Sequence, residues 1–265
     1  TNIAYALYND DPPGPDTASS SYAHSKGMVM LNDDRGFWLI HSKPNWPSAR
    51  GDNASAFPDT TYAQSLMCIT INTSSFDSVA THQMVNYPYL YDSFMSDNLI
   101  VALPLFNEWV NDHGHSSDLN LTSSVTSRGG VSYEMFAKAR EWGKDLYDDL
   151  VAPTLQEALH VETWRNGAGG RMSSNCQGPD DDVWQQWPLE YDVLQVSEVT
   201  MPDGQSWLGT KDHSKWAATI GGSTICVADI NRMCSQENRG GGAVCVDTTP
   251  SAQSGASASA FAHIE

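Results

Sequence analysis

The tripeptide His-Ser-Lys occurs three times in this chain, at residues 24–26, 41–43 and 213–215. Random placement of the residues would give only about 0.2 pairs of the form His-x-Lys. The first and third copies share a longer frame, because a histidine lies 17 residues after His24 and an asparagine lies 18 residues after His213. Two apolar stretches separate the two residues in each frame. The sequence therefore predicts one strand-turn-strand unit used twice, which constrains the chain to a fold with two similar halves.

The residue types in these pairs suit phosphodiester chemistry without a metal. In a strand, residues i and i+2 point to the same face, so His24 lies beside Lys26 and His213 lies beside Lys215. One imidazole can attack phosphorus and form a phosphohistidine, and the other can protonate the leaving oxygen. The two ammonium groups can hold the non-bridging oxygens. We predict these four residues as catalytic and favour His24 as nucleophile and His213 as acid, with the reverse assignment left open.

Residues beside the motifs are candidates for supporting roles. His41 is either an ordinary strand residue or a neighbour that orients the site, and Asn231 is its counterpart in the second unit. Trp46 is a candidate platform for base stacking. The candidate substrate-binding cations are Lys43, Arg232 and Arg239.

Seven stretches of the chain carry a resemblance to a known family. They are residues 7–13, 22–27, 36–42, 62–68, 212–216, 228–232 and 236–242. In this order they resemble the deoxyribonuclease II enzymes, within the phospholipase D-like superfamily. The resemblance implies metal-independent endonucleolytic cleavage of DNA at acid pH, with 3′-phosphate and 5′-hydroxyl ends. It also implies an α/β fold of two pseudo-symmetric halves, each with a β-sheet flanked by helices, and no cofactor.

The resemblance also bears on the five cysteines. It implies a bridge between Cys226 and Cys245. It further implies an N-terminal family segment that is missing before the first residue, through processing, as a separate chain or because the chain is incomplete. Cys68 is expected to pair with a cysteine of that segment. Cys176 and Cys234 remain, and a bridge between them is a hypothesis.

The net charge of −18 is unusual for a protein that binds DNA, because phosphate contacts favour a basic surface. Charging all eight histidines brings this value to −10. Carboxylates also begin to lose their charge near pH ~4–4.5. An acid enzyme would therefore repel its polyanionic substrate least at its working pH.

The chain is expected in the secretory pathway, as a lysosomal or secreted glycoprotein. No window approaches the ~18 apolar residues of a membrane span, and the start of the chain has neither an initiator Met nor a signal sequence. Asn53, Asn72 and Asn120 each begin a glycosylation sequon. No membrane partner is expected, and the sequence does not choose between a monomer and a homodimer.

We expect a first half at residues 1–125, a second half at residues 126–247 and a Ser/Ala-rich tail at residues 248–265, with the halves meeting near residues 113–130. Predicted strands of the first half are 3–8, 28–31, 37–40, 66–71 and 99–103, with helices at 75–85 and 105–110. The second half is predicted to hold a helix at 132–150, strands at 159–164 and 193–199, and two strands around Cys226.

Two further functions fit the same residues. A related phosphodiesterase could act on another diester, such as a phospholipid, because only the walls of the groove would differ. A non-catalytic or toxin-like homologue is the other alternative. The intact pairs at His24 and His213 argue against it, whereas the acidic composition argues for it.

Overall fold

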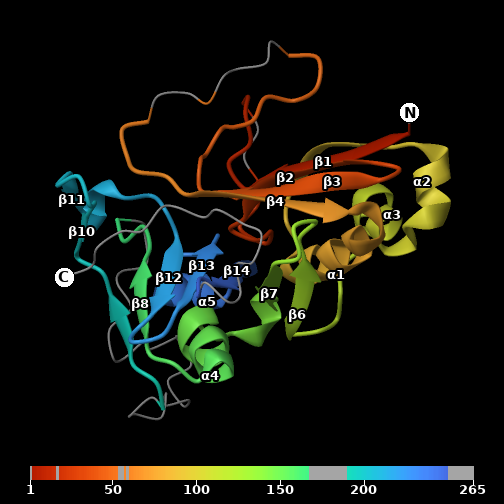
Figure 1. Cartoon of the computed structure of the whole chain (residues 1–265). Helices are drawn as coiled ribbons and strands as arrows, with labels where there is room; N and C mark the ends of the chain where they lie inside the picture. Colours follow the sequence, from red (N-terminus) through yellow and green to blue (C-terminus); the bar gives the residue numbers. More distant parts are fainter. Residues whose placement is uncertain (1, 16–17, 53–56, 58–59, 167–189, 250–265) are drawn as a thin grey trace.

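The computed structural model describes residues 2–15, 18–52, 57, 60–166 and 190–249. Two β-sheets lie on either side of a central helix (residues 76–86), and a second helix (residues 104–111) packs beside it in the same core (Figure 1). The predicted α/β class is confirmed. None of the helices in these ranges is long and apolar enough to span a membrane.

The first sheet is antiparallel and has the strand order β4-β3-β2-β1-β5. Its first four strands confirm the strands predicted from the alternation of apolar residues. The fifth strand was not predicted. The bounds are β1 (Ile3–Asn9), β2 (Lys26–Asn32), β3 (Arg35–His41), β4 (Leu66–Asn72) and β5 (Leu90–Met95).

In the sequence, one helix lies between β4 and β5, and two more helices follow β5. The helices α1 (Phe76–Asn86) and α3 (Pro104–Asn111) confirm two predicted helices, but α2 (Asp97–Ala102) forms where a strand was expected. Leu99 and Leu103, four residues apart, are buried, whereas Val101 between them is 85% exposed. This helical spacing of buried positions, within a short apolar run that also suits a strand, explains the wrong prediction.

The second sheet has the strand order β6-β7-β14-β13-β12-β8-β9. Its strand pairs are antiparallel except for the parallel pair of β8 and β9. The bounds are β6 (Asn120–Thr126), β7 (Ser132–Lys138), β8 (Leu159–Glu162), β9 (Val193–Gln195), β12 (Trp216–Thr219), β13 (Thr224–Ala228) and β14 (Gly241–Asp247).

Smaller elements complete the second half. The strands β10 (Glu198–Thr200) and β11 (Ser206–Leu208) form a separate antiparallel ribbon. Short helices lie at α4 (Ala152–Leu155) and α5 (Cys234–Glu237). Single turns of 3₁₀-helix cover Thr73–Ser75, Arg140–Trp142 and Gly209–Lys211, and a π-helical turn covers Tyr147–Val151.

The long helix predicted at residues 132–150 is wrong. Its first part is strand β7, which lies inside the sheet between β6 and β14. Met135 and Phe136 are both fully buried because they face opposite sides of this sheet and belong to different cores. A strand that is buried on both faces produces a nearly continuous apolar run, which imitates the apolar stripe of a helix. Gly143, in the left-handed region, then separates the two short helical turns.

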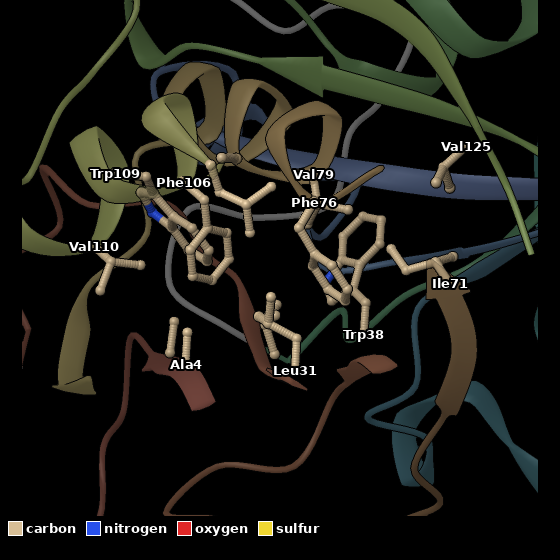
Figure 2. Close-up of a cluster of buried hydrophobic side chains, with 14 of the residues drawn as sticks. Ala4, Leu31, Trp38, Ile71, Phe76, Val79, Phe106, Trp109, Val110 and Val125 are labelled. Carbon is tan, nitrogen blue, oxygen red and sulfur yellow. The ribbon is translucent and has the colours of Figure 1, made fainter. Parts of the chain in front are cut away.

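The larger core fills the space between the two sheets (Figure 2). Leu31 and Trp38 enter it from the first sheet, Phe76 from the central helix α1, and Val125 from the second sheet. The indole N–H of Trp38 donates to the Tyr8 hydroxyl at 2.9 Å, so this buried polar atom keeps a partner. The shared core fixes the two sheets against each other, and burying one such side chain contributes roughly 1.5–3 kcal/mol.

A second core lies on the other face of the second sheet. Here Tyr147 and Val151 of the π-helical turn pack over β8 and β12. The predicted disulfide between Cys226 and Cys245 is present, and it joins residues that face each other on β13 and β14. Cys176, the partner suggested for Cys234, and the end of the tail (250–265) lie outside the described residues, so that bridge stays a hypothesis. The predicted division at residues 125 and 126 falls within β6 and stays a prediction.

Gly27, which follows the first His-Ser-Lys tripeptide, lies in a position that admits no side chain. A Cβ atom there would lie 2.2 Å from the Tyr8 hydroxyl and 2.5 Å from the carbonyl oxygen of Leu39. We expect Gly27→Ala to lower the free energy of unfolding by roughly 1–3 kcal/mol in urea denaturation, because β2 must shift to relieve the clash.

The matched control is Gly129→Ala, where the nearest atom to a new Cβ lies 3.8 Å away. This variant should unfold as the parent does. Equal stability of the two variants would contradict the packing of β2 against β1 and β3.

Candidate active site

The first His-x-Lys pair is held by a carboxylate from the neighbouring strand. Lys26 is the first residue of β2 and faces Asn9 at the end of β1, so Asp10 follows at the same edge of the sheet. The ammonium group of Lys26 binds one carboxylate oxygen of Asp10, and Arg239 donates to the other at 2.9 Å. His24 Nδ1 lies 3.5 Å from Asp10 Oδ2 and 3.3 Å from Lys26 Nζ.

The second pair is held by backbone and hydroxyl oxygens. His213 Nδ1 lies 2.8 Å from the carbonyl oxygen of Ser42, just beyond β3. Lys215 Nζ donates to the carbonyl oxygen of His213 at 2.7 Å, and its backbone N–H contacts the Ser65 hydroxyl at 3.3 Å. The ring of Trp164 lies 5.3 Å from the His213 ring. This pair therefore has no carboxylate bound directly to it among the described residues.

Contacts between the two sheets bring the pairs to one site. Asn231, between β13 and β14, places its side-chain nitrogen 3.2 Å from His24 Nε2. Ser42 makes the reciprocal contact from the first sheet to His213. The positive charge of Lys26 also lowers the pKa values of both His213 and Lys215, in addition to the larger effect of burial. The charges of the two pairs thus act on each other.

Burial is the main influence on the protonation of the two histidines, and the neighbouring cations add to it. Burial lowers the pKa of His213 to about 3, with further lowering by Lys215 and Lys26. Burial also lowers the pKa of His24, and Asp10 is the main group that opposes this shift. Burial alone would raise the pKa of Asp10, but His24, Lys26 and Arg239 hold it well below its usual range. An anion bound between the lysines would favour protonated histidine.

The first group of supporting residues lies beside Lys26. The register that pairs Gly27 with Ile40 places His41 next to Lys26. His41 Nδ1 accepts from the backbone N–H of Lys43 at 3.2 Å, and its ring meets that of Trp46 edge-on at 4.9 Å. Trp46 is half-buried, and the Lys43 side chain is likewise partly covered.

The predicted substrate-binding arginines are placed differently. Arg239 enters the site through Asp10 and also donates to the carbonyl oxygen of Tyr22 at 3.1 Å. The guanidinium of Arg232 binds both carboxylate oxygens of Asp148, at 2.9 and 3.1 Å, behind the loop that carries Asn231. Arg232 therefore braces that loop, and the structure does not bring its charged group to the histidines.

Three buried carboxylates were missed in the sequence. Asp10 follows the predicted strand at residues 3–8, and its position at a strand end was a usable signal. Asp229 lies two residues before Asn231, accepts from the Gly242 N–H at 2.6 Å, and has a pKa raised by burial to about 7. Glu162 ends β8, and neither of its carboxylate oxygens has a hydrogen-bond partner in the described ranges. No residue near it in the sequence indicated its burial.

The remaining predicted positions concern glycosylation, disulfide pairing and metal binding. Asn72 and Asn120, at the ends of exposed strand edges, are both exposed, and Asn53 lies outside the described residues. Cys68 is exposed and has no disulfide partner within the described part of the chain. Over the same part, no three His, Cys, Asp or Glu side chains gather in a group that could hold a metal ion.

The fold and the site define a class of α/β protein in which two His-x-Lys pairs from different sheets meet among buried cations. The chain matches the family model described as Deoxyribonuclease II over residues 1–260. It belongs to the deoxyribonuclease II family.

Individual relatives agree with this assignment. The chain is 35% identical to Plancitoxin-1 of Acanthaster planci over 252 residues, which cover 93% of this chain and 67% of the relative. It is 35% identical to Deoxyribonuclease-2-alpha of Rattus norvegicus over 253 residues, with 92% and 69% covered. It is 33% identical to Deoxyribonuclease-2-alpha of Sus scrofa over 252 residues, with 92% and 66% covered. The chain thus spans about two thirds of the length of these relatives.

Glu162 gives the site region a pH-dependent stability. Burial, and then the charge of Asp212, raise its pKa from 4.5 to about 8. A carboxyl group with a raised folded-state pKa contributes its full stability when the pH is below its unfolded-state pKa. This contribution is lost as the pH rises through the folded-state pKa. We therefore compare the melting temperature of Glu162→Gln with that of the parent. The variant's value minus the parent's should increase by on the order of 5 °C between about pH 5 and pH 8, because only the parent loses stability as Glu162 ionises.

Thermal unfolding followed by circular dichroism at both pH values measures this difference. Glu141→Gln is the control because that carboxylate is 66% exposed, and it should keep the parent's pH dependence. A difference between Glu162→Gln and the parent that does not change with pH would show that Glu162 titrates normally.

Proposed function

We propose that this protein is a metal-independent acid endodeoxyribonuclease that hydrolyses DNA to 3′-phosphate and 5′-hydroxyl ends through a phosphohistidine intermediate. The observation that carries the proposal is that contacts between the two sheets join the two His-x-Lys pairs. His24, beside the first sheet, is hydrogen-bonded to Asn231 from the second, and His213, beside the second sheet, is hydrogen-bonded to the Ser42 carbonyl from the first. Membership of the deoxyribonuclease II family and the similarity to deoxyribonucleases of rat and pig support DNA as the substrate.

The four residues supply the steps that the reaction needs. One imidazole nitrogen attacks phosphorus, the P–O5′ bond breaks, and the second imidazole donates a proton to the leaving 5′-oxygen. Water then attacks the phosphohistidine, loses a proton to the second imidazole, and releases the 3′-phosphate as the N–P bond breaks. Lys26 and Lys215 stabilise the charge on the non-bridging oxygens during both steps.

The charge distribution suits an anionic substrate at acid pH. The chain carries a net charge of −18, but three cations lie at the site: Lys26 and Arg239, which both bind Asp10, and Lys215, which binds the carbonyl oxygen of His213. Acid protonates histidines and surface carboxylates, which reduces repulsion of DNA without removing these cations. The affinity for DNA is expected to fall steeply with salt.

The arrangement of strands supports two phospholipase D-like halves, residues 1–125 and 126–247. Each His-x-Lys pair directly precedes or begins the first strand of a hairpin, β2–β3 in one case and β12–β13 in the other. In both cases an earlier strand, β1 or β8, pairs antiparallel with that first strand. We infer that a pseudo-twofold axis relates the halves and passes through the site.

A secretory location fits the covalent chemistry. Disulfides such as Cys226–Cys245 persist in oxidising compartments, and Asn72 and Asn120 present exposed sequons. We propose a lysosomal or secreted glycoprotein. The exposed thiol of Cys68 is accessible to a cysteine of a further segment or chain.

Plasmid nicking at about pH 5 in excess EDTA tests the function directly. The parent should cleave, whereas His213→Ala should lose at least about a hundredfold of the rate, because it lacks one of the two imidazoles. His115→Ala, an exposed histidine outside the site, is the control and should cleave as the parent does.

Failure of the parent to cleave under these conditions would contradict the proposal. Release of headgroups from phospholipid vesicles, in place of DNA cleavage, would instead favour the alternative phosphodiesterase.

A further inference from the structure

The two histidines of the site have different hydrogen-bond partners on Nδ1. The partner of His213 Nδ1 is the Ser42 carbonyl oxygen, at 2.8 Å. A carbonyl oxygen only accepts, so Nδ1 of His213 must carry the hydrogen. In the neutral ring, the lone pair then lies on Nε2, which is the form that a nucleophile requires. Burial and nearby cations lower the pKa values of both histidines, so the distinction between the two rings rests on their Nδ1 partners, a carbonyl oxygen for His213 and Asp10 for His24.

His24 is surrounded by groups that suit both of its protonation states. On one side, Nδ1 faces Asp10 at 3.5 Å and Lys26 at 3.3 Å. On the other side, Nε2 faces the side-chain amide of Asn231, whose Oδ1 is buried without a partner in the described part of the chain. An amide offers both a donor and an acceptor, so rotation of Asn231 can satisfy either the free or the protonated nitrogen. A carboxylate beside the ring favours imidazolium.

The difference arises at comparable places in the two sheets. Asp10 follows β1, which pairs with β2, and Trp164 follows β8, which pairs with β12. Asp10 contacts His24, whereas Trp164 packs its indole against His213. One strand end thus supplies a negative charge to its histidine, and the other supplies an uncharged aromatic ring.

We propose that His213 is the nucleophile of this site and that His24 is the acid and base, positioned by Asp10 and Asn231. This assignment rests on the proposed function and reverses the one that the sequence favoured. Nε2 of His213 forms the N–P bond while the P–O5′ bond breaks, and His24 gives its proton to the leaving oxygen. In the second step, His24 takes a proton from the attacking water, and the N–P bond breaks.

A substrate whose leaving group needs no proton separates the two roles. Thymidine 3′-(p-nitrophenyl phosphate) releases nitrophenolate, so loss of the acid should affect its first step little. His24→Ala should cleave DNA at least about a hundredfold more slowly than the parent. It should nevertheless release a burst of nitrophenolate at a rate within about tenfold of the parent's rate. The burst stops because no base then activates water, and a thymidine phosphoryl adduct remains on His213.

Intact-protein mass spectrometry at neutral pH detects that adduct. His24→Ala should gain the mass of one thymidine phosphoryl group, and His213→Ala should show neither burst nor adduct. An adduct on His213→Ala and none on His24→Ala would overturn the assignment. Failure of the parent to cleave either substrate in EDTA would instead contradict the proposed function itself.

Asp10→Asn tests the positioning role. Without the carboxylate, the pKa of His24 falls, so the alkaline limb of the DNA-cleavage profile should move to lower pH while the nitrophenolate burst persists. An unchanged pH profile in a folded Asp10→Asn protein would show that Asp10 does not act through His24.

Discussion

The rest of the site depends on the burial of cations, of which Lys26 and Arg239 bind a carboxylate directly and Lys215 binds none among the described residues. Lys26 and Lys215 are almost completely covered, at 3% and 0% exposure, and Arg239 shares Asp10 with Lys26. Buried charges without partners cost several kcal/mol each, so such an arrangement persists only where the surrounding fold holds it. An anion that enters from outside would pair with Lys215, and under the proposed function the phosphodiester is that anion.

The strands of both sheets hold these buried charges in place because the two sheets share one hydrophobic core. The core between the sheets contains Trp38 from β3, Phe76 from α1 and Met135 from β7, so movement of one half disturbs the packing of the other. The loop between β13 and β14 is braced by the Arg232–Asp148 pair, and it brings Asn231 to His24. The geometry of the proposed active site is therefore set by residues that take no part in the proposed reaction.

Much of the fold was accessible from the sequence because its signals are local. The alternation of apolar residues marks β1–β4, and the recurring His-x-Lys tripeptides mark candidate site residues, without knowledge of the contacts. The errors arose where tertiary structure decides. Met135 and Phe136 face two different cores. A sequence pattern that assumes one buried face, whether of a helix or of a strand, does not predict such a strand. Asp10 and Glu162 are buried near lysines from other parts of the chain, Lys26 and Lys215, which the local sequence does not indicate. Arg232 binds Asp148 and therefore does not reach the histidines.

The central claim is that both His-x-Lys pairs form a single anion site. NMR of the ring nitrogens of His24 and His213, during titration with inorganic phosphate at about pH 5, tests it most directly. A shared site predicts that the resonances of both rings move with the same dependence on phosphate concentration. Movement of one histidine alone, or of the two with different affinities, would show that the pairs act separately and would contradict the account.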